Sequence, residues 1–387
     1  MTSDHQPNCI FIVLPWSPDL RGGVSVVVSQ LAKEFNALRV SREIIVSDWS
    51  ASALTKGVDG HFRFGFSVLG APTLVGLVRA VYRLPRRLLN THRLLNDRKV
   101  SAINFHYVGF DALGVAVLKF LGAYRGMLVL SFHGTDVRAP RSAIERYLWG
   151  FLLSTADSIT TCSASLAATL VTAHGSLGSK AIVIHNGVDQ KVFYPRFRAE
   201  SNGLRYLPKR YLVSVGSYIP RKGHLSMLAA FKQIASDHSD LHLVIIGQDG
   251  SERAPSLLFA EREGLADRVH CLVDMPPESV AVAVASAIAC VQPSIAEPFG
   301  IAVIEAGACG TPIIASAVGG HLELLTEGDT GYFFEAGNVD DCARAMRQVL
   351  NGPESAATVG NQFRQIVMNR YTWSACATGY AEAAGCK

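Results

Sequence analysis

Two glutamates in the second half of the chain stand in a segment whose residue types could hold a diphosphate. Glu297 is followed at once by Pro298, and Gly300 comes three positions after Glu297. Proline is suited to the first position of a helix, and glycine lets the backbone approach a ligand closely. The N–H groups and the positive potential at such a helix start favour a bound phosphate. Glu305, eight positions after Glu297, could then accept hydrogen bonds from ribose hydroxyls.

Basic side chains occur in the segment Val215–Gly223, directly after an apolar run. Lys222 supplies a flexible point charge that could neutralise a diphosphate. Arg221 stands beside it, and Ser217 lies five positions before Lys222. The alternative is that this lysine is a plain surface residue and that the two glutamates are surface carboxylates at a helix start.

The first half of the chain offers two further candidates. Gly22 and Gly23 precede a helix-like segment, Val24–Leu38, where a loop could approach phosphates. The pattern is not GxGxxG, so it does not indicate a dinucleotide oxidoreductase, and a tight turn is the alternative. His133 ends an apolar strand, where a buried polar side chain needs a partner. It is therefore either a site residue or a hydrogen-bonded core histidine.

These residues follow short apolar runs that alternate with helix-like segments. The predicted strands are residues 9–14, 42–46, 100–105, 127–132, 181–184, 211–215, 241–246, 269–272, 287–291 and 312–315. Such alternation is typical of α/β chains with parallel sheets covered on both faces. Polar residues and prolines between Tyr194 and Arg210 indicate a linker. We therefore expect two doubly wound domains, 1–195 and 205–370, with a C-terminal helix at 371–387 that packs back on the first.

The composition is that of a globular chain. The 387 residues are 49% hydrophobic and 18% charged, which excludes intrinsic disorder. No run reaches the ~18 apolar residues of a membrane-spanning helix, and we identify no secretory signal. Eight cysteines are scattered without a CxxC pair, so we expect a reducing cytoplasm and neither a disulfide scaffold nor a zinc site.

Positive charge is concentrated in the first half of the chain. Residues 1–195 carry 20 Lys and Arg against 12 Asp and Glu, a net charge of +8, whereas the whole chain has +4. The densest basic stretch, Arg79–Lys99, has apolar residues between its cations, a pattern that fits an anionic membrane surface. The alternative is an ordinary amphipathic helix pair broken at Pro85. No nucleic-acid-binding motif accompanies the charge, so we expect no nucleic-acid partner.

Taken together, the motifs resemble the retaining glycosyltransferases of the large GT-B family 4. The resemblance extends from about residue 9 to Trp373. The motifs that carry it are Arg21–Val24, Ser131–Asp136, His185–Asp189, Val215–Gly223, Val244–Gly247, Glu297–Ala306, Gly310–Pro312 and Gly319–Glu323. Their joint order and spacing are specific, although each motif alone is weak.

The resemblance implies a GT-B fold, with two Rossmann-like domains facing a central cleft, and a role for each matching residue. It assigns catalysis to His133, Lys222 and Glu297, with Glu297 on the transferred sugar and His133 beside it. Binding of the nucleotide-sugar donor is assigned to Gly22, Gly23, Asn186, Ser217, Arg221, Gly247, Phe299, Gly300, Ile301 and Glu305. Ser217 departs from the family pattern, which has an arginine directly after the glycine that ends the strand.

The implied reaction moves a hexose-type sugar from a nucleoside-diphosphate sugar to a hydroxyl, with retention at the anomeric carbon. It uses no metal and no cofactor beyond the donor. The basic first domain favours a glycan or lipid-linked acceptor at the cytoplasmic face of the plasma membrane, in assembly of surface polysaccharide or glycolipid. Two alternatives stay open: a nucleotide-sugar epimerase, and a non-catalytic sugar-nucleotide-binding subunit suggested by Ser217.

Overall fold

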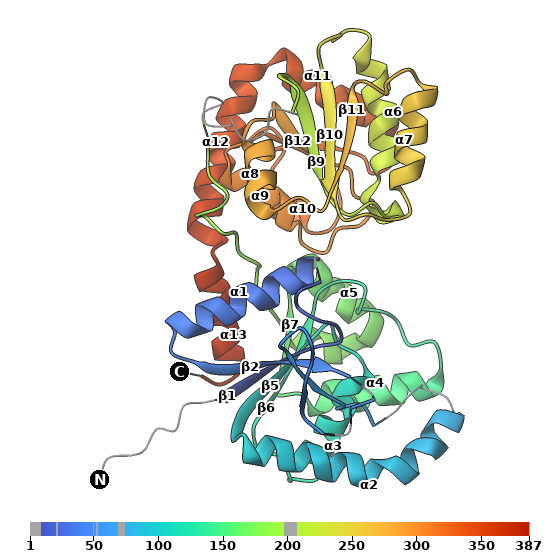
Figure 1. Ribbon diagram of the computed structural model, residues 1–387, viewed down its shortest axis with the longest axis vertical. Helices are drawn as coiled ribbons and strands as arrows, with labels where there is room; N and C mark the ends of the chain where they lie inside the picture. The colour runs from blue at the N-terminus through green and yellow to red at the C-terminus, as the bar shows by residue number, and fades with distance from the viewer. Residues whose placement is uncertain are drawn as a thin grey trace. The chain divides into compact units, whose positions relative to one another are not determined.

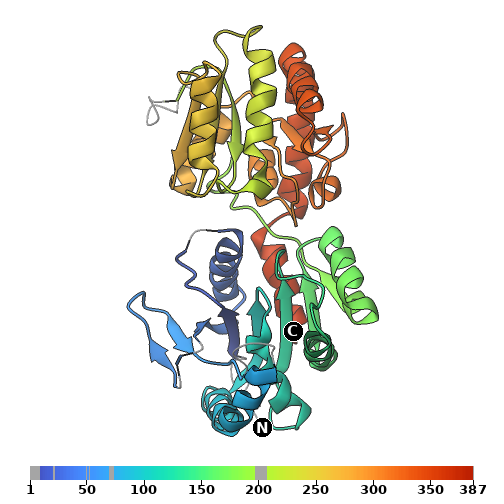
Figure 2. The same ribbon diagram turned by 90° about the vertical axis from the view of Figure 1, so that its right-hand side faces the viewer.

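The chain folds into two compact units, each built around one sheet (Figures 1 and 2). The computed structural model describes residues 9–20, 22–48, 50–51, 53–68, 74–196 and 207–386, with the side chains of 74–82 not described. Arg21, the Arg79 side chain and residues 197–206 of the expected linker thus lie outside the described residues. Unit 1 comprises residues 1–185 and 373–387, and unit 2 residues 186–372.

Unit 1 contains an eight-stranded sheet in the order β3-β4-β2-β1-β5-β6-β7-β8. Its strands are parallel except for the β3–β4 pair. The strands are β1 (Cys9–Leu14), β2 (Ser41–Ser47), β3 (Thr55–Lys56), β4 (Phe62–Phe64), β5 (Val100–His106), β6 (Met127–Phe132), β7 (Ser158–Thr161) and β8 (Ala181–Val183). All six β1 residues are buried, as expected for a central strand covered on both faces.

Helices cover both faces of this sheet (Figure 1). The helices are α1 (Gly23–Ala37), α2 (Leu74–Asp97), η1 (Phe110–Ala112), α3 (Leu113–Phe120), α4 (Ala143–Thr155), α5 (Ala164–His174), η2 (Gly175–Lys180) and α13 (Trp373–Ala383). Helix α13 packs against α1, so the C-terminal segment belongs to unit 1. Residues 186–195, which we expected in the first domain, belong to unit 2 because Val188 pairs with Thr372 and donates to the Tyr371 carbonyl.

Unit 2 contains a six-stranded, fully parallel sheet in the order β11-β10-β9-β12-β13-β14. The strands are β9 (Tyr211–Val215), β10 (His242–Gly247), β11 (Val269–Val273), β12 (Ala289–Gln292), β13 (Ile313–Ser316) and β14 (Tyr332–Phe334). The helices are η4 (Pro220–Lys222), α6 (His224–Ala235), α7 (Arg253–Arg262), α8 (Pro277–Ala285), α9 (Ile301–Ala308), α10 (His321–Leu324), α11 (Val339–Asn351) and α12 (Pro353–Arg370). Helices α6, α7 and α11 lie together, and α8, α9 and α12 form a second group (Figure 1).

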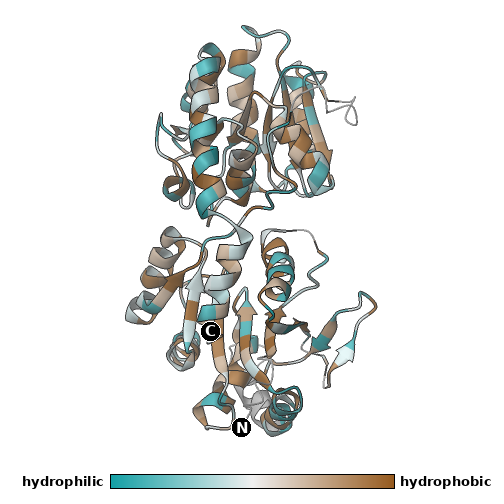
Figure 3. Cartoon of the chain, turned by 90° about the vertical axis from the view of Figure 1, so that its left-hand side faces the viewer, coloured by the Kyte–Doolittle hydropathy of each residue, from teal (hydrophilic) through white to brown (hydrophobic). Residues whose placement is uncertain are grey.

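Side-chain caps and amphipathic faces explain several helices. Ser142 and Ser163 accept the N–H of the residue three positions later at the starts of α4 and α5, and Asn338 does so for α11. Such caps satisfy donors that the first helical turn leaves free. The helices in Figure 3 carry both hydrophilic and hydrophobic residues, as expected where one helix face packs on a sheet.

Pro85 does not divide the basic stretch into two helices. Helix α2 continues through it from Leu74 to Asp97, so the alternative of a helix pair broken at Pro85 is wrong. Proline removes one backbone hydrogen bond from a helix interior, but the other bonds of a 24-residue helix remain.

The order of strands reverses once in each unit. In unit 1 the chain turns back between β1 and β5, and in unit 2 between β9 and β12. Ligands of doubly wound sheets bind beyond the carboxyl ends of the strands at such points. In unit 1, Gly22 follows β1 and His106 ends β5. In unit 2, Ser217 follows β9 and Glu297 follows β12.

Candidate active site

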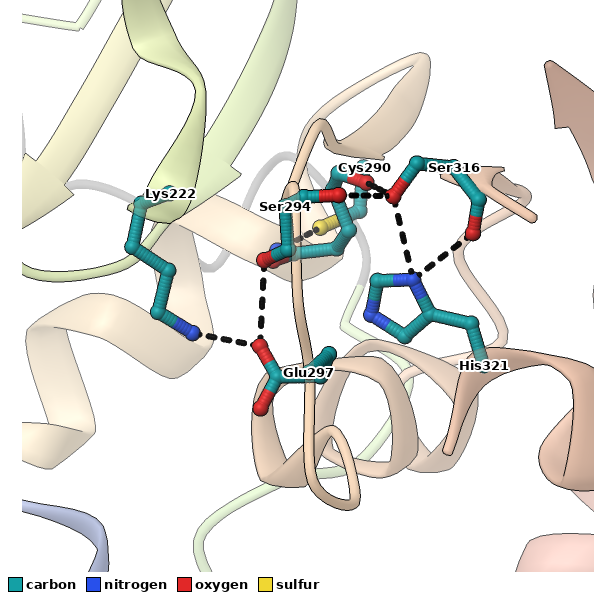
Figure 4. Close-up of polar contacts among 7 residues, drawn as sticks. Lys222, Cys290, Ser294, Glu297, Ser316 and His321 are labelled. Atoms are coloured by element: carbon teal, nitrogen blue, oxygen red, sulfur yellow. Dashed lines mark hydrogen bonds and ion pairs between the residues drawn. The ribbon is translucent and has the colours of Figure 1, made fainter. Parts of the chain in front are cut away.

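Lys222 and Glu297 form an ion pair at the β9/β12 switch point of unit 2 (Figure 4). The Lys222 Nζ lies 2.6 Å from Glu297 Oε2, which also accepts from Ser294 Oγ at 3.0 Å. The two side chains are only 17% and 11% exposed. Burial alone would raise the pKa of Glu297, but the Lys222 ammonium acts against it and the net direction is down. Glu297 is therefore a buried carboxylate held ionised by its partner.

Two glycines after β13 hold the Glu297 loop in place. The Gly320 N–H donates to the Glu297 carbonyl at 2.8 Å. A Cβ at Gly319 would lie 2.2 Å from the Glu297 carbonyl oxygen, and one at Gly320 would lie 2.2 Å from that of Phe299. Any larger residue would push this loop away, so close backbone contact fixes where Glu297 stands.

Helix α9 begins directly after this loop, so its N-terminus lies next to Glu297. Gly300 caps it with φ of +107°, a conformation that disfavours other residues. Phe299 is buried beside Tyr371, with ring centroids 6.0 Å apart, and Ile301 is the first helical residue. The first N–H groups of a helix have no intrahelical acceptor, so they are available to an anion.

Glu305 lies one turn into α9 and carries no ion-pair partner among the described residues. Its side chain is partly buried, and desolvation raises the pKa of Glu305 to about 8. The contrast with Glu297 comes from the surroundings, since only Glu297 has a lysine beside it. A ligand that donates hydrogen bonds to Glu305 would relieve this unfavourable burial.

The β9 loop places Ser217, Arg221 and Lys222 with different partners. Ser217 Oγ donates to Gln248 Oε1 at 3.2 Å. The Arg221 guanidinium has no hydrogen-bond or ion-pair partner within the described part of the chain, although its carbonyl accepts from Ile295 N–H. A Cβ at Gly247 would lie 1.9 Å from the Gly216 carbonyl oxygen, so Gly247 lets the β9 and β10 loops touch. Of the three polar side chains, Lys222 alone contacts Glu297.

His321 is a residue of this region that the sequence did not single out. It is fully buried, and its Nδ1 lies 3.0 Å from the Ser316 carbonyl oxygen (Figure 4). The His321 ring lies beside Gly300, because a Cβ at Gly300 would be 3.2 Å from Cδ2 of the ring. Burial lowers the pKa of His321 although the Glu297 carboxylate opposes the shift. Only the position of this histidine beside the Gly319–Gly320 pair could have drawn attention to it.

His133 lies at the carboxyl end of β6 in unit 1 and pairs with a second histidine. His106 Nδ1 and His133 Nε2 are 2.9 Å apart, and the rings stack with centroids 5.1 Å apart. His106 is 1% exposed, whereas His133 is only partly buried. Desolvation lowers the pKa of His133 to about 4 and holds that of His106 well below its ordinary value. The pair is therefore neutral near pH 7.

Asp136 fixes the loop that carries His133. Its carboxylate accepts the N–H groups of His133, Gly134 and Val108, which joins the loops after β5 and β6. Tyr107, beside Val108, has a positive φ of 61°, and its hydroxyl lies 2.6 Å from Thr135 Oγ1. These contacts restrain the backbone on both sides of the histidine pair.

The remaining predicted site residues lie apart from these two clusters. Gly22 caps α1, where its carbonyl accepts from Val26 N–H, and Gly23 is the first helical residue. Asn186 is buried in the segment that pairs with Thr372, and its Oδ1 has no partner among the described residues. No contact given by the structure joins Asn186 to the Lys222–Glu297 pair.

Two kinds of feature are absent from the described part of the chain. No group of three His, Cys, Asp or Glu side chains is arranged to hold a metal ion. Among the described helices, none combines the length and the apolar character needed to cross a bilayer.

Comparisons with known proteins match both halves of the chain. The family model "Glycosyltransferase Family 4" matches residues 21–192, and "Glycosyl transferases group 1" matches residues 197–366. The sulfoquinovosyl transferase SQD2 of Arabidopsis thaliana is 26% identical over 282 residues. That alignment spans 70% of this chain and 52% of the relative, about half of its length.

Two solved structures show the fold. Sucrose-phosphate synthase from Thermosynechococcus elongatus has a TM-score of 0.76 at 22% identity, covering 97% of this chain and 98% of the other. Anabaena Alr3699/HepE, solved with UDP and glucose, has a TM-score of 0.75 at 19% identity, covering 97% and 99%. The predicted GT-B fold with two doubly wound domains is confirmed. The chain belongs to the group 1 and family 4 glycosyltransferases.

Proposed function

We propose that this protein is a retaining, metal-independent hexosyltransferase that uses a nucleoside-diphosphate sugar and a hydroxyl acceptor. The observation that carries the proposal is the buried Lys222–Glu297 pair beside the N-terminus of α9. This arrangement offers positive charge for a diphosphate and a carboxylate for sugar hydroxyls within one loop cluster. The UDP and glucose bound in the HepE structure support the same class of donor.

Each group has one assigned task in this proposal. Lys222 and the first N–H groups of α9 stabilise the departing diphosphate, and Arg221 is free to join them. Glu297 accepts hydrogen bonds from the transferred sugar, Glu305 accepts from the ribose, and His133 contacts the reacting sugar. The donor carbon–oxygen bond breaks, the acceptor oxygen bonds on the same face, and the leaving phosphate oxygen takes the acceptor proton. Catalysis then consists mainly of positioning and electrostatic stabilisation.

We further propose that the acceptor is a glycan or lipid-linked sugar at an anionic membrane surface, as in assembly of surface polysaccharide or glycolipid. Arg83, Arg86 and Arg93 are exposed on α2, with Leu89 45% exposed among them. Arg87 is excluded from this surface because its Nη1 donates to the carbonyls of Ala51 and Gly65.

Exposed apolar side chains near α2 support the same surface. Helix α3 packs against both α2 and α4. Phe120 and Leu121 at its end are 72% and 64% exposed, and Tyr147 on α4 is 77% exposed. Aromatic and cationic side chains together suit the interface of an anionic bilayer.

Sedimentation with anionic and neutral vesicles tests the membrane surface. Changing Arg83, Arg86 and Arg93 to Glu should abolish binding to anionic vesicles at low salt, while a single reversal of an exposed arginine in unit 2, Arg262→Glu, keeps it. Unchanged sedimentation of the triple variant would show that α2 is not the contact.

The transferase itself is tested by thermal stabilisation with a panel of nucleoside diphosphates and their sugars. A ligand at about 100 times its Kd adds about 2.7 kcal/mol of stability, which melting detects readily. Products formed from the stabilising donor and candidate acceptors are then identified by mass spectrometry, with and without EDTA. An epimerised donor without transfer would indicate the epimerase alternative, and binding without turnover the non-catalytic one.

A further inference from the structure

We infer that His106 is a positioning residue that fixes the proton of His133 on Nδ1, so that His133 meets its ligand as a hydrogen-bond donor. The inference rests on the proposed contact of His133 with the reacting sugar. It concerns a residue whose only conspicuous sequence feature is its place at the end of an apolar strand.

The pair lies at the switch point of the unit 1 sheet. His106 ends β5 and His133 follows β6, the next strand in the sheet, so both side chains stand at the same edge. The ring planes are 20° apart, and Nδ1 of His106 faces Nε2 of His133 at 2.9 Å. One of these nitrogens must carry the shared proton, because two lone pairs would repel.

The surroundings of His106 decide whether its proton lies on Nδ1 or on Nε2. Its other nitrogen, Nε2, is buried without a hydrogen-bond partner among the described residues. If the proton sat on Nε2, a buried N–H donor would be left unpaired. Orphaned N–H groups are rarer in folded proteins than unpaired acceptors, so the proton belongs on Nδ1, where it is bonded.

The position of the His106 proton determines which nitrogen of His133 is protonated. With His106 Nδ1–H donating, His133 Nε2 is the acceptor, and a neutral His133 then carries its own proton on Nδ1. His133 is only partly buried, and its Nδ1 has no partner in the described part of the chain. The N–H that remains free is a donor of fixed direction, suited to a sugar oxygen.

The C-terminal helix holds His106 in this orientation. The Tyr380 ring on α13 lies 5.3 Å from the His106 ring, and both side chains are 1% exposed. His106 is thus enclosed between His133 and Tyr380, and it cannot rotate without disturbing α13. Partners that orient a metal-bound histidine in this way typically change activity by ~10- to 100-fold when they are removed, and we expect a loss of the same order here.

Unit 2 contains a matched pair that serves as a control. His242 Nδ1 and His270 Nε2 are 3.0 Å apart, and their rings stack with centroids 5.2 Å apart. His242 begins β10 and His270 is the second residue of β11, so this pair lies at the amino ends of its strands. It has the same geometry as the His106–His133 pair but stands at the opposite sheet edge from the Lys222–Glu297 site.

The test combines nitrogen-15 NMR of the histidine rings with steady-state kinetics. The full chain is labelled on histidine, and the His133 signals are identified by their loss in His133→Asn. We expect the Nδ1-protonated form in the wild type and a shift toward the Nε2-protonated form in His106→Phe, which keeps a ring but no donor. Finding His133 protonated on Nε2 in the wild type would overturn the inference whether or not transfer occurs.

Kinetics with the donor found in the panel give the second readout. His106→Phe should lower kcat by ~10- to 100-fold with little change in KM. His106→Asn, whose amide N–H occupies a similar position, should restore most of kcat, and His242→Phe should leave it unchanged. Full activity in a folded His106→Phe variant would contradict the inference, and equal loss in His106→Asn would show that the ring is required only for packing. If no donor supports transfer, the proposed function fails while the ring spectra still decide the tautomer.

Discussion

The polar side chains at the two switch points are paired in different ways, as ions in unit 2 and as neutral rings in unit 1. In unit 2 a full positive charge and a full negative charge meet at 2.6 Å. In unit 1 two imidazoles meet at 2.9 Å, and burial keeps both neutral. The Lys222 ammonium has three N–H donors and gives one to Glu297, so it can also bind a second negative charge. A neutral histidine pair can only direct hydrogen bonds. Under the proposed function, charge stabilisation falls to unit 2 and orientation of the sugar to unit 1.

The largest effect should come from breaking the charged pair. We expect Lys222→Ala to lower kcat by ~10²–10³, because one cation on the leaving diphosphate is removed. The variant also leaves Glu297 as a buried carboxylate without its counterion, a loss of about 3 to 5 kcal/mol in folding stability. Enzyme assays and urea unfolding measure the two losses separately.

A double variant separates these contributions. Lys222→Ala with Glu297→Gln should regain stability but not turnover, since no uncompensated charge remains. Lys232→Ala, a change on α6, removes an exposed ion pair with Glu263 at the end of α7 and should change neither quantity much. Near-normal turnover in Lys222→Ala would contradict the assignment of the Val215–Gly223 loop to the donor.

The next effect separates residues on the sugar from the residue on the ribose. His133→Ala and Glu297→Gln should reduce kcat by about 10²-fold while affinity for the bare nucleoside diphosphate changes little. Glu305→Ala should instead weaken that affinity. Calorimetric titration with the nucleoside diphosphate tests the division, and equal losses in all three variants would show that the roles are misassigned.

A smaller effect concerns the pH dependence of stability. The native state holds a proton on Glu305 up to about pH 8, whereas the unfolded chain releases it near pH 4.5. Stability therefore falls as pH rises through that window, and Glu305→Gln removes the loss. The variant should melt above the wild type at pH 9 and show no gain at pH 4. The exposed Glu261→Gln change is the control, and an equal gain at both pH values would argue against the raised pKa.

The smallest effect should come from the position where the family arginine is replaced. Ser217→Arg should tighten nucleoside-diphosphate binding if the pocket has room, and Arg221→Ala should lower turnover only if Arg221 contacts the phosphates. Binding and kinetic measurements on the two variants decide which basic side chain accompanies Lys222. A sharp loss in Arg221→Ala with no gain in Ser217→Arg would assign the phosphate contact to Arg221.

Most apolar strands were predictable from the sequence, whereas one polar strand and three short ones were not. All ten predicted runs overlap strands, from β1 to β13. The pattern missed β7, because Thr160 and Thr161 look polar although both are buried. Their hydroxyls donate to Ser131 Oγ and the Ser163 carbonyl, contacts that only the folded chain supplies. The two-residue β3 and the three-residue β4 and β14 were also missed, although the three-residue β8 was predicted within the run 181–184.

The residues of the candidate site likewise divide into those that the sequence predicted and those that only the structure reveals. Lys222 and Glu297 could be picked out because their motifs match a family, but their ion pair joins residues 75 positions apart. His106 matches no motif that we recognised, and His321 lies in the Gly319–Glu323 motif without an assigned role. Each becomes conspicuous only through what packs on it. Tyr380 reaches His106 from the far end of the chain, and no local pattern predicts a contact across that distance.

The return of α13 to unit 1 has a consequence for how the molecule is made. Trp373, Cys376 and Tyr380 are buried in unit 1, yet they follow every residue of unit 2 in the chain. Every residue of unit 2 leaves the ribosome before them. Unit 2 is therefore complete before α13 emerges, while the cover over α1 and His106 closes only after α13 has emerged. The histidine pair of unit 1 would then be the later of the two clusters to mature.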